Sequence, residues 1–314
     1  MKSSNIGGQA VLEGIMMRHK DIYSVAVRKP DGEIAIKTEP YKSLVNSKML
    51  KETPIVRGVF NFLESLVVGM KCLTYSSSFY EEEEEEKVTL TEEEQAKADA
   101  KKEKQDKILM GVTVAFSIVL SVAVFIMLPY FIASFLRRIT ESELLVAVAE
   151  SIVRIVIFIM YIVLISKMKD IQRVFMYHGA EHKCINCIEH GMELNVDNVM
   201  KSSREHKRCG TSFLLFVMIV SIIFFLFIRV NSPWLRVVVR LLLVPVIAGV
   251  SYELIRFAGR SENKVIGLLS RPGMALQRLT TAEPDESMVE VAIAAVEAVF
   301  DWKAYLQENF PEET

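Results

Sequence analysis

Residues 212–230 read SFLLFVMIVSIIFFLFIRV, and this stretch decides the fold class. Its apolar side chains cover the whole circumference of a helix, whereas helices in the core of a soluble protein usually keep a polar stripe. About 20 apolar residues are enough for a helix to cross the roughly 30 Å of hydrocarbon in a membrane. The stretch is therefore predicted to be a transmembrane helix.

Three other stretches, 108–136, 144–166 and 235–257, have the same length and character. The hydrophobic share of the 314-residue chain, 51%, is also higher than soluble proteins usually have. Buried core helices are the alternative, but they would not be apolar on every side. The sequence predicts a mainly α, polytopic helical membrane protein with about four spans.

The distribution of Lys and Arg predicts the orientation in the membrane. The loop at 167–211 holds eight Lys and Arg residues, and the approach to the first span is rich in Lys. Positively charged flanks stay in the cytosol. The loop and both chain termini are therefore expected to be cytosolic.

The net charge of −2 lacks the basic surplus of a nucleic-acid-binding protein, so no nucleic acid partner is expected.

Turn residues and polar residues assign the segments outside the spans. Pro30 to Gly32 separate two strand-like runs, so a small β hairpin is expected near the N-terminus. Arg57, Asn61 and Glu64 would be costly in lipid, which favours an interfacial or re-entrant helix there over a fifth span. The expected segments are an N-terminal cytosolic segment with the hairpin (1–53), the interfacial or re-entrant helix (54–75), an acidic charged linker (76–107), spans 1 and 2 (108–166), a cytosolic metal-binding loop (167–211), spans 3 and 4 (212–257) and a cytosolic tail with an amphipathic helix (258–314).

The central loop contains the motif MYHGAEHKCINCIEHG at 176–191. His178, Glu181 and His182 form H-x-x-E-H, and on a helix these three positions share one face. In metal-dependent hydrolases with this arrangement the two His bind zinc and the Glu acts as a general base. The spacing predicts a metal site with Glu181 as the candidate catalytic residue.

Two further pairs, Cys184-x-x-Cys187 and His206-x-x-Cys209, resemble the ligand spacing of structural zinc sites. Thiols in the reducing cytosol are available as ligands. A closed shell of these four residues would leave no open position for catalysis. A mixed shell drawn from His178, His182, His206 and Cys209, with Glu181 beside a water, would keep one open. Histidines that only pack or face solvent are the remaining alternative. The expected ligands of zinc or a similar divalent transition metal are His178, His182, Cys187, His206 and Cys209.

Five motifs in order along the chain carry a resemblance to a known family. They are GGQAVLEGIMMR (7–18), YHGAEHK (177–183), HKRCGTSF (206–213), YELIRFAGR (252–260) and RPGMALQRLTTAEPD (271–285). Together they resemble the YqhQ-like family of uncharacterised bacterial integral membrane proteins, which are often labelled predicted metal-dependent enzymes. The resemblance implies a multi-pass protein of the bacterial cytoplasmic (inner) membrane. It singles out His178, Glu181, His182, His206, Cys209, Glu13 and Arg18.

The N-terminal motif is of interest because it combines glycines with Glu13 and Arg18. It matches neither the dinucleotide fingerprint nor the P-loop, so no nucleotide cofactor is expected. Packing against the central loop is the favoured interpretation, with Glu13 as an outer partner or an additional ligand of the metal site and Arg18 as a second outer partner. Within the spans, Glu150 and Arg154 are spaced to pair on one helix, as are Glu253 and Arg256.

Two functions follow as hypotheses. The first is a metal-dependent hydrolase that acts at the membrane surface. The second is a non-enzymatic membrane factor with a structural metal, which serves as an assembly, quality-control or regulatory partner of another membrane complex or forms a homo-oligomer. A transporter is disfavoured because the chain lacks paired broken spans.

Overall fold

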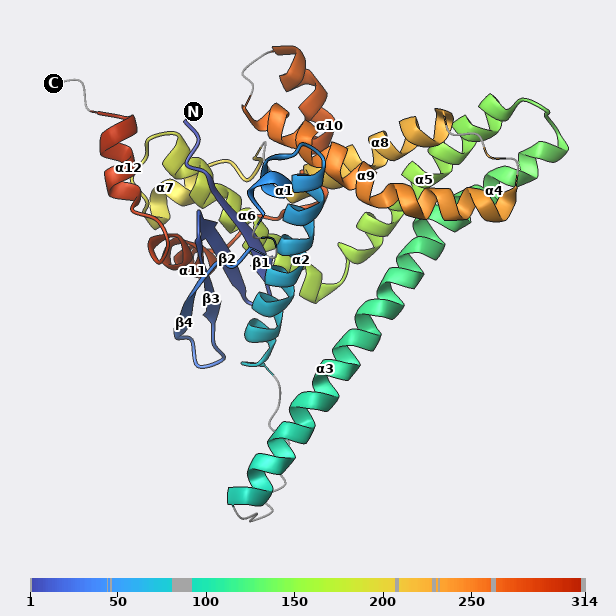
Figure 1. The fold of residues 1–314 in the computed structure, drawn as a ribbon. Helices are drawn as coiled ribbons and strands as arrows, with labels where there is room; N and C mark the ends of the chain where they lie inside the picture. The colour runs from blue at the N-terminus through green and yellow to red at the C-terminus, as the bar shows by residue number, and fades with distance from the viewer. Residues whose placement is uncertain are drawn as a thin grey trace. The chain divides into compact units, whose positions relative to one another are not determined.

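A computed structural model describes residues 2–43, 45, 47–80, 92–206, 209–227, 230, 232–260 and 264–311. The chain is mainly helical with one small antiparallel sheet, as the sequence predicts (Figure 1). It divides into two compact units. The first unit comprises Met1–Tyr80, Ile162–Phe224 and Leu241–Thr314, and the second comprises Glu81–Tyr161 and Phe225–Arg240.

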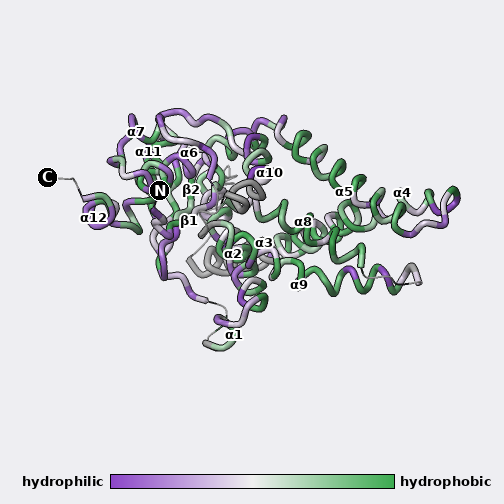
Figure 2. The backbone as a smooth tube through the Cα atoms, turned by 90° about the horizontal axis from the view of Figure 1, so that it is seen from above, coloured by the Kyte–Doolittle hydropathy of each residue, from purple (hydrophilic) through white to green (hydrophobic). Residues whose placement is uncertain are grey.

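Among the described residues, four helices are long and apolar enough to cross a membrane: Ile108–Arg138, Glu143–Ile165, Gly210–Phe227 and Trp234–Ala258. They confirm the four predicted spans to within a few residues at each end. Figure 2 shows that α5 (Glu143–Ile165) and α8 (Gly210–Phe227) are apolar along most of their length, whereas α9 (Pro233–Arg260) is apolar with hydrophilic positions in between. The first span joins the end of α3 (Glu92–Val122), a π-helical turn η1 (Ala123–Met127), α4 (Leu128–Ser134) and a short 3-10 helix η2 (Phe135–Arg138).

The predicted hairpin is part of a larger sheet. Strands β1 (Ile6–Val11), β2 (Gly14–His19), β3 (Ile22–Arg28) and β4 (Ile34–Pro40) pair antiparallel in sequence order. The turn at Pro30 to Gly32 joins β3 to β4, and Gly32 adopts a φ of 89°, which favours glycine. The sequence missed β1 and β2 because β2 is buried on both faces, so its residues show no polar and apolar alternation.

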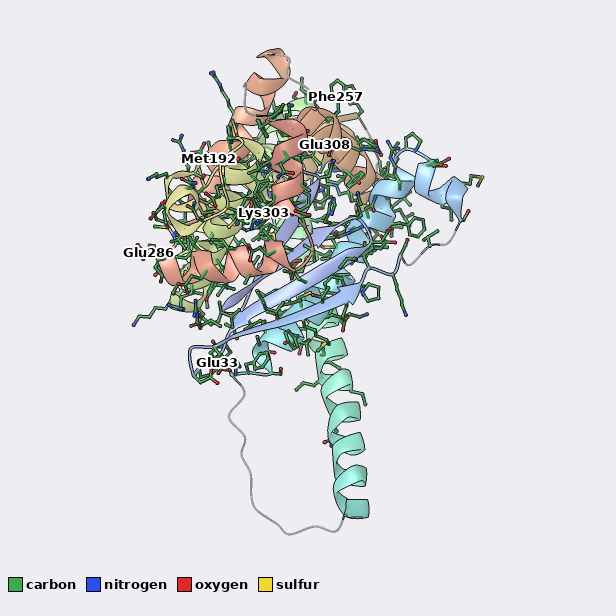
Figure 3. The ribbon with its side chains drawn as sticks, turned by 90° about the vertical axis from the view of Figure 1, so that its left-hand side faces the viewer. Glu33, Met192, Phe257, Glu286, Lys303 and Glu308 are labelled. Atoms are coloured by element: carbon green, nitrogen blue, oxygen red, sulfur yellow. The ribbon has the colours of Figure 1, made fainter. Side chains whose placement is uncertain are left out.

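Helices cover both faces of the sheet. On one face, α6 (Lys169–Glu189) and α11 (Glu286–Glu297) share a core with Ile15, Met17 and Ala26. On the other face, α2 (Val56–Ser77) packs against Met16 and Val25. Figure 3 shows α11, with Glu286 at its start, crossing the strands, and Glu33 at the β3–β4 turn. The remaining helices are α1 (Lys48–Glu52), α7 (Val196–Lys201), α10 (Lys264–Thr280) and α12 (Trp302–Asn309).

The segments predicted between these elements have different outcomes. Of the acidic linker, residues 81–91 lie outside the described part, and residues 92–107 belong to α3. The sequence predicted that Glu253 pairs with Arg256 on the same helix. In the structure its ion-pair partner is Arg57 of α2, and Arg256 has a smaller electrostatic influence on it. The Glu253 carboxylate accepts hydrogen bonds from Arg57. The charge of Arg57 is therefore paired within the protein and does not depend on contact with water.

Candidate metal centre

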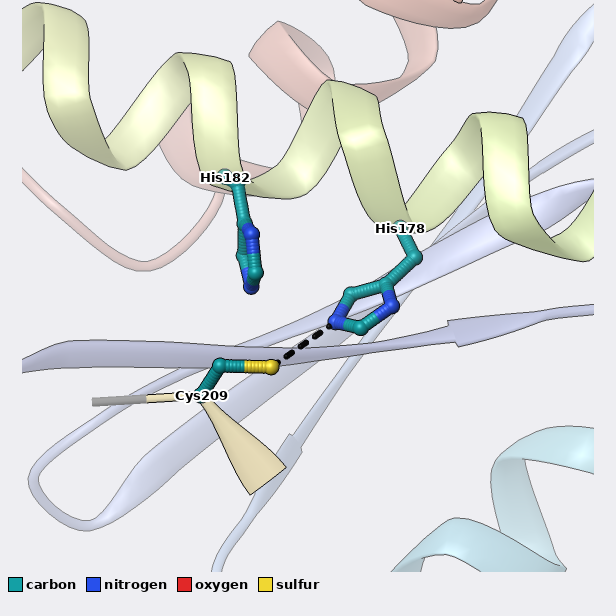
Figure 4. A group of neighbouring side chains, drawn as sticks. All are labelled: His178, His182 and Cys209. Carbon is teal, nitrogen blue, oxygen red and sulfur yellow. Dashed lines mark hydrogen bonds between the residues drawn. The ribbon is translucent and has the colours of Figure 1, made fainter. Parts of the chain in front are cut away.

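His178 and His182 lie one turn apart on α6, and Cys209 directly precedes α8 (Figure 4). One ligand atom from each of the three residues lies within 4.8 Å of the other two. The Nε2 atom of His178 is 3.2 Å from Cys209 Sγ, and the centroids of the His178 and His182 rings are 4.5 Å apart. Two imidazoles and a thiol are suitable ligands for zinc and related transition metals. The geometry therefore fits a metal ion between these three side chains.

Both imidazoles are fixed by backbone carbonyls at their outer nitrogen atoms. His178 Nδ1 donates to the Thr280 carbonyl at 2.9 Å, and His182 Nδ1 donates to the Arg204 carbonyl at 2.6 Å. A carbonyl only accepts, so Nδ1 is the donor in both rings, and in the neutral imidazole this places the lone pair on Nε2. Metal-binding histidines are oriented in this manner by outer hydrogen bonds. The chain thus holds both residues in the tautomer that metal binding requires.

A small cavity of about 80 Å³ adjoins these residues. Its walls come from β1, α6 and the segment that leads into α8: Ile6, Gly7, Gly8, His178, Glu181, His182, Ile185, His206, Cys209 and Gly210. Gly8 permits the close approach of β1, because a Cβ atom there would be 2.8 Å from Glu181 Cγ and 2.8 Å from the Met16 carbonyl oxygen. The cavity has room for ordered water beside the ligand group.

Glu181 lines this cavity and is only 5% exposed. Its burial raises the pKa of the carboxyl group, which nearby His178 and the backbone N–H of Gly8 partly counteract. A carboxylate with a raised pKa is a better proton acceptor near neutral pH than an exposed one. The position and environment of Glu181 are those of a candidate general base.

His206 also lines the cavity, but it is not one of the three grouped ligands. Its ring lies 5.9 Å from that of His182, and its Nε2 atom is 3.4 Å from Glu189 Oε2. Glu189 in turn accepts hydrogen bonds from the backbone N–H and the hydroxyl of Ser4, both at 2.8 Å. The sequence interpretation missed Glu189, although it lies seven residues, about two turns, after His182 and so on the same face of α6.

The structure does not bring Cys187 to this group. Cys187 is nine residues, about two and a half turns, after His178 and therefore lies on the opposite side of α6. Its thiol donates to the Glu193 carbonyl at 3.3 Å, and burial raises its pKa to about 11. Cys184 is fully buried in the core, and its pKa is raised well above the usual value. The closed zinc shell of Cys184, Cys187, His206 and Cys209 is therefore not formed.

The two residues expected as outer partners occupy different places. Glu13 lies in the β1–β2 turn and forms an ion pair with Arg173, and it accepts a longer hydrogen bond from Tyr177 at 3.3 Å. It therefore attaches the N-terminal sheet to α6 just before His178. Arg18 is not at the site, because its guanidinium group stacks over the Tyr41 ring at 3.2 Å.

Gly179 permits the close contact between α6 and the segment that follows α10. A Cβ atom at this position would lie 2.1 Å from the Ala282 carbonyl oxygen. Gly179→Ala must displace that segment, together with the Thr280 carbonyl that orients His178. We expect unfolding to become easier by about 1–3 kcal/mol and metal affinity to fall about 10–100-fold. Thermal unfolding and zinc titration measure both effects.

Gly111→Ala is the matched control, because a Cβ atom at Gly111 meets nothing within 4 Å. Since Ala is a better helix former than Gly, this change should be neutral or stabilising. Equal behaviour of the two variants would contradict the steric role of Gly179.

Comparison with known proteins gives a family but no activity. Residues 53–302 match the family model described as "Protein of unknown function (DUF1385)". The chain is 36% identical over 308 residues to "Uncharacterized protein YqhQ" of Bacillus subtilis (strain 168), which covers 96% of this chain and 94% of that protein. No solved structure matches.

Proposed function

This chain belongs to the DUF1385 family and to the YqhQ-like proteins, and because that membership names no reaction, we propose a function from the site itself. The protein is a membrane protein with a zinc-type centre held by His178, His182 and Cys209. Its function is that of a metal-dependent hydrolase at the membrane surface. The observation that carries the proposal is the convergence of these three ligands beside a cavity that Glu181 lines.

The number of ligands supports catalysis over a purely structural role. Structural zinc sites are usually closed by four protein ligands, whereas catalytic sites keep three and leave one position open. A bound zinc ion would supply Lewis acidity and a bound water with a pKa near 7. In that arrangement Glu181 accepts a proton within the cavity, while Thr280 and Arg204 keep the imidazoles in place through their carbonyl groups.

The place of Cys209 in the chain supports action at the membrane surface. It immediately precedes Gly210, where the third candidate span begins. We propose that the protein lies in the bacterial cytoplasmic membrane with the metal centre on the cytosolic side, because Lys and Arg are concentrated in the segment around it.

One observation favours the non-enzymatic alternative. The cavity holds only about 80 Å³, and His182 and Cys209 on its wall are 1% and 5% exposed. This is smaller than ordinary ligand pockets of about 300–1,000 Å³. A substrate would therefore have to present a narrow group, or β1 would have to move. In the alternative, the metal only holds β1, α6 and α8 together.

Metal content is the first test of both forms of the proposal. Full-length protein purified in detergent should hold about one zinc or similar ion per chain by elemental analysis. Cys209 should be protected from an impermeant thiol reagent in opened membranes and should react after the ion is removed by a chelator. In intact cells it should not react. Metal-free protein with a reactive Cys209 would contradict the metal centre, and labelling from outside would contradict the orientation alone.

A further inference from the structure

The second unit contains a buried charge cluster that the metal centre does not involve. Glu150 and Arg154 of α5 and Arg240 of α9 are 5%, 5% and 6% exposed. Arg154 Nη2 donates to Glu150 Oε1 at 2.7 Å, and Arg240 Nη2 donates to Glu150 Oε2 at 2.8 Å. The predicted pairing of Glu150 with Arg154 is thus present, but a second guanidinium group shares the same carboxylate.

Within these three residues, this sharing leaves one more positive than negative charge. Two guanidinium groups and one carboxylate give a net charge of +1 (2 − 1). Arg240 Nη1 lies 2.6 Å from Glu150 Oε1 but without hydrogen-bond geometry. Arg240 thus shares its carboxylate with a second guanidinium group, and its Nη1 atom has no hydrogen-bond partner among the described residues. An incompletely paired guanidinium group is costly within a membrane span. An anion beside Arg240 would remove that cost.

A cavity of about 330 Å³ lies beside Arg240 and Glu150. Arg236 also lines it and donates through Nε and Nη2 to the Val230 carbonyl, a neutral acceptor. At the rim, Arg137 is paired with Glu143. Among the described lining residues, three Arg face two Glu. The cavity is therefore electropositive overall.

Aromatic rings hold the guanidinium groups in place. Arg240 lies over the rings of Tyr130 and Phe225 at 5.0 and 4.8 Å, and Arg154 lies over Phe225 at 4.8 Å. Such cation–π contacts use the positive charge of a guanidinium without occupying its N–H groups, which stay available for hydrogen bonds. These N–H groups are the ones that bind phosphate oxygens in pairs.

The charge cluster lies well inside the predicted spans and not at their ends, so it is not a group of surface ion pairs. Glu150 is seven residues after the start of α5, which corresponds to about 10 Å along the helix. Arg240 is six residues into the span that begins at Trp234, or about 9 Å. The cavity extends from the helix ends to this level, so an anion could reach Arg240 from the end of the spans.

From these observations we propose that the cavity binds the tetrahedral phosphate group of a ligand, either as free inorganic phosphate or as the phosphate of a lipid headgroup. Arg240 and Arg236 supply the donors, and Glu150 limits affinity by competing for Arg240. This site is separate from the proposed metal centre, and neither depends on the other.

The test titrates inorganic phosphate into delipidated full-length protein in detergent, at constant ionic strength, with dissociation constants from equilibrium dialysis. Arg240→Gln should weaken binding at least about tenfold, because it removes charge-assisted hydrogen bonds. It should also fold, since it leaves the neutral pair of Glu150 and Arg154. Glu150→Gln should strengthen binding, and this opposite change keeps the proposal testable if Arg240→Gln proves unstable. Arg278→Gln, with a side chain 67% exposed, is the matched control and should have no effect.

A second arm separates the two sources of phosphate. Native mass spectrometry of protein supplied with phosphatidylglycerol should show a retained lipid that Arg240→Gln loses, if the site takes a headgroup. Saturable binding of inorganic phosphate without lipid retention would identify the free anion. Either result, with its dependence on Arg240, supports the site. Absence of binding in both arms, or binding that is equal in Arg240→Gln and the wild type, would overturn it.

Discussion

His182→Ala is expected to lower the affinity of the full-length protein for zinc by more than about 10²-fold. A structural zinc site with four ligands contributes about 10–16 kcal/mol, so one ligand corresponds to roughly 3 kcal/mol, or about two orders of magnitude. His182 cannot be replaced by a neighbour, because Cys187 lies on the opposite side of α6 and His206 faces Glu189. Competition with a chromophoric chelator measures the loss.

The stability of the same variant gives a second readout. A metal that binds only the folded chain stabilises it in proportion to the logarithm of its concentration. Excess zinc should therefore raise the melting temperature of the wild type and have a much smaller effect on His182→Ala. His190→Ala is the matched control, because His190 is an exposed residue at the end of the same helix and donates only to the Asn186 carbonyl. If both variants bind zinc as the wild type does, the metal centre is contradicted.

The four spans were predictable because lipid imposes a simple requirement on sequence. A helix that crosses the membrane must be apolar on every side, and α8 can be recognised without knowledge of its neighbours. The sheet was only half predictable. Strands β3 and β4 have a clear turn at Gly32, whereas β2 is buried between α11 and α2 and has lost the pattern that identifies a half-exposed strand.

The candidate site, too, could be predicted only in part from the sequence. Helical spacing alone places His178, Glu181 and His182 together, because they lie on the same face of one helix, one turn apart. Sequence spacing could not identify which cysteine is a ligand. That depends on how the segment before α8 packs against α6, which is a long-range contact. Cys209 meets His178 across this long-range contact, whereas the Cys187 thiol donates to the Glu193 backbone carbonyl. The carbonyl groups of Thr280 and Arg204 carry no sequence signal, because every residue has one.

Glu181→Gln is expected to separate the enzyme from the structural alternative. Gln keeps the size of the side chain and an oxygen that can accept from the Gly8 N–H, but it removes the proton acceptor. If Glu181 is a general base, the rate should fall by about 10²–10⁴ while zinc content and melting temperature stay unchanged. Because the substrate is not identified, complementation of a deletion strain at matched expression measures the loss.

The control for this change is Glu193→Gln, an exposed carboxylate whose backbone carbonyl alone contacts Cys187. It should complement fully. If Glu181 instead orients or binds the metal, Glu181→Gln should lose zinc and stability together, because the buried carboxylate would then be part of the scaffold. Full complementation with normal zinc content would remove Glu181 from the chemistry and contradict the hydrolase. The three results differ because a proton acceptor is required only during a reaction, whereas an outer partner of the metal is required in the resting protein.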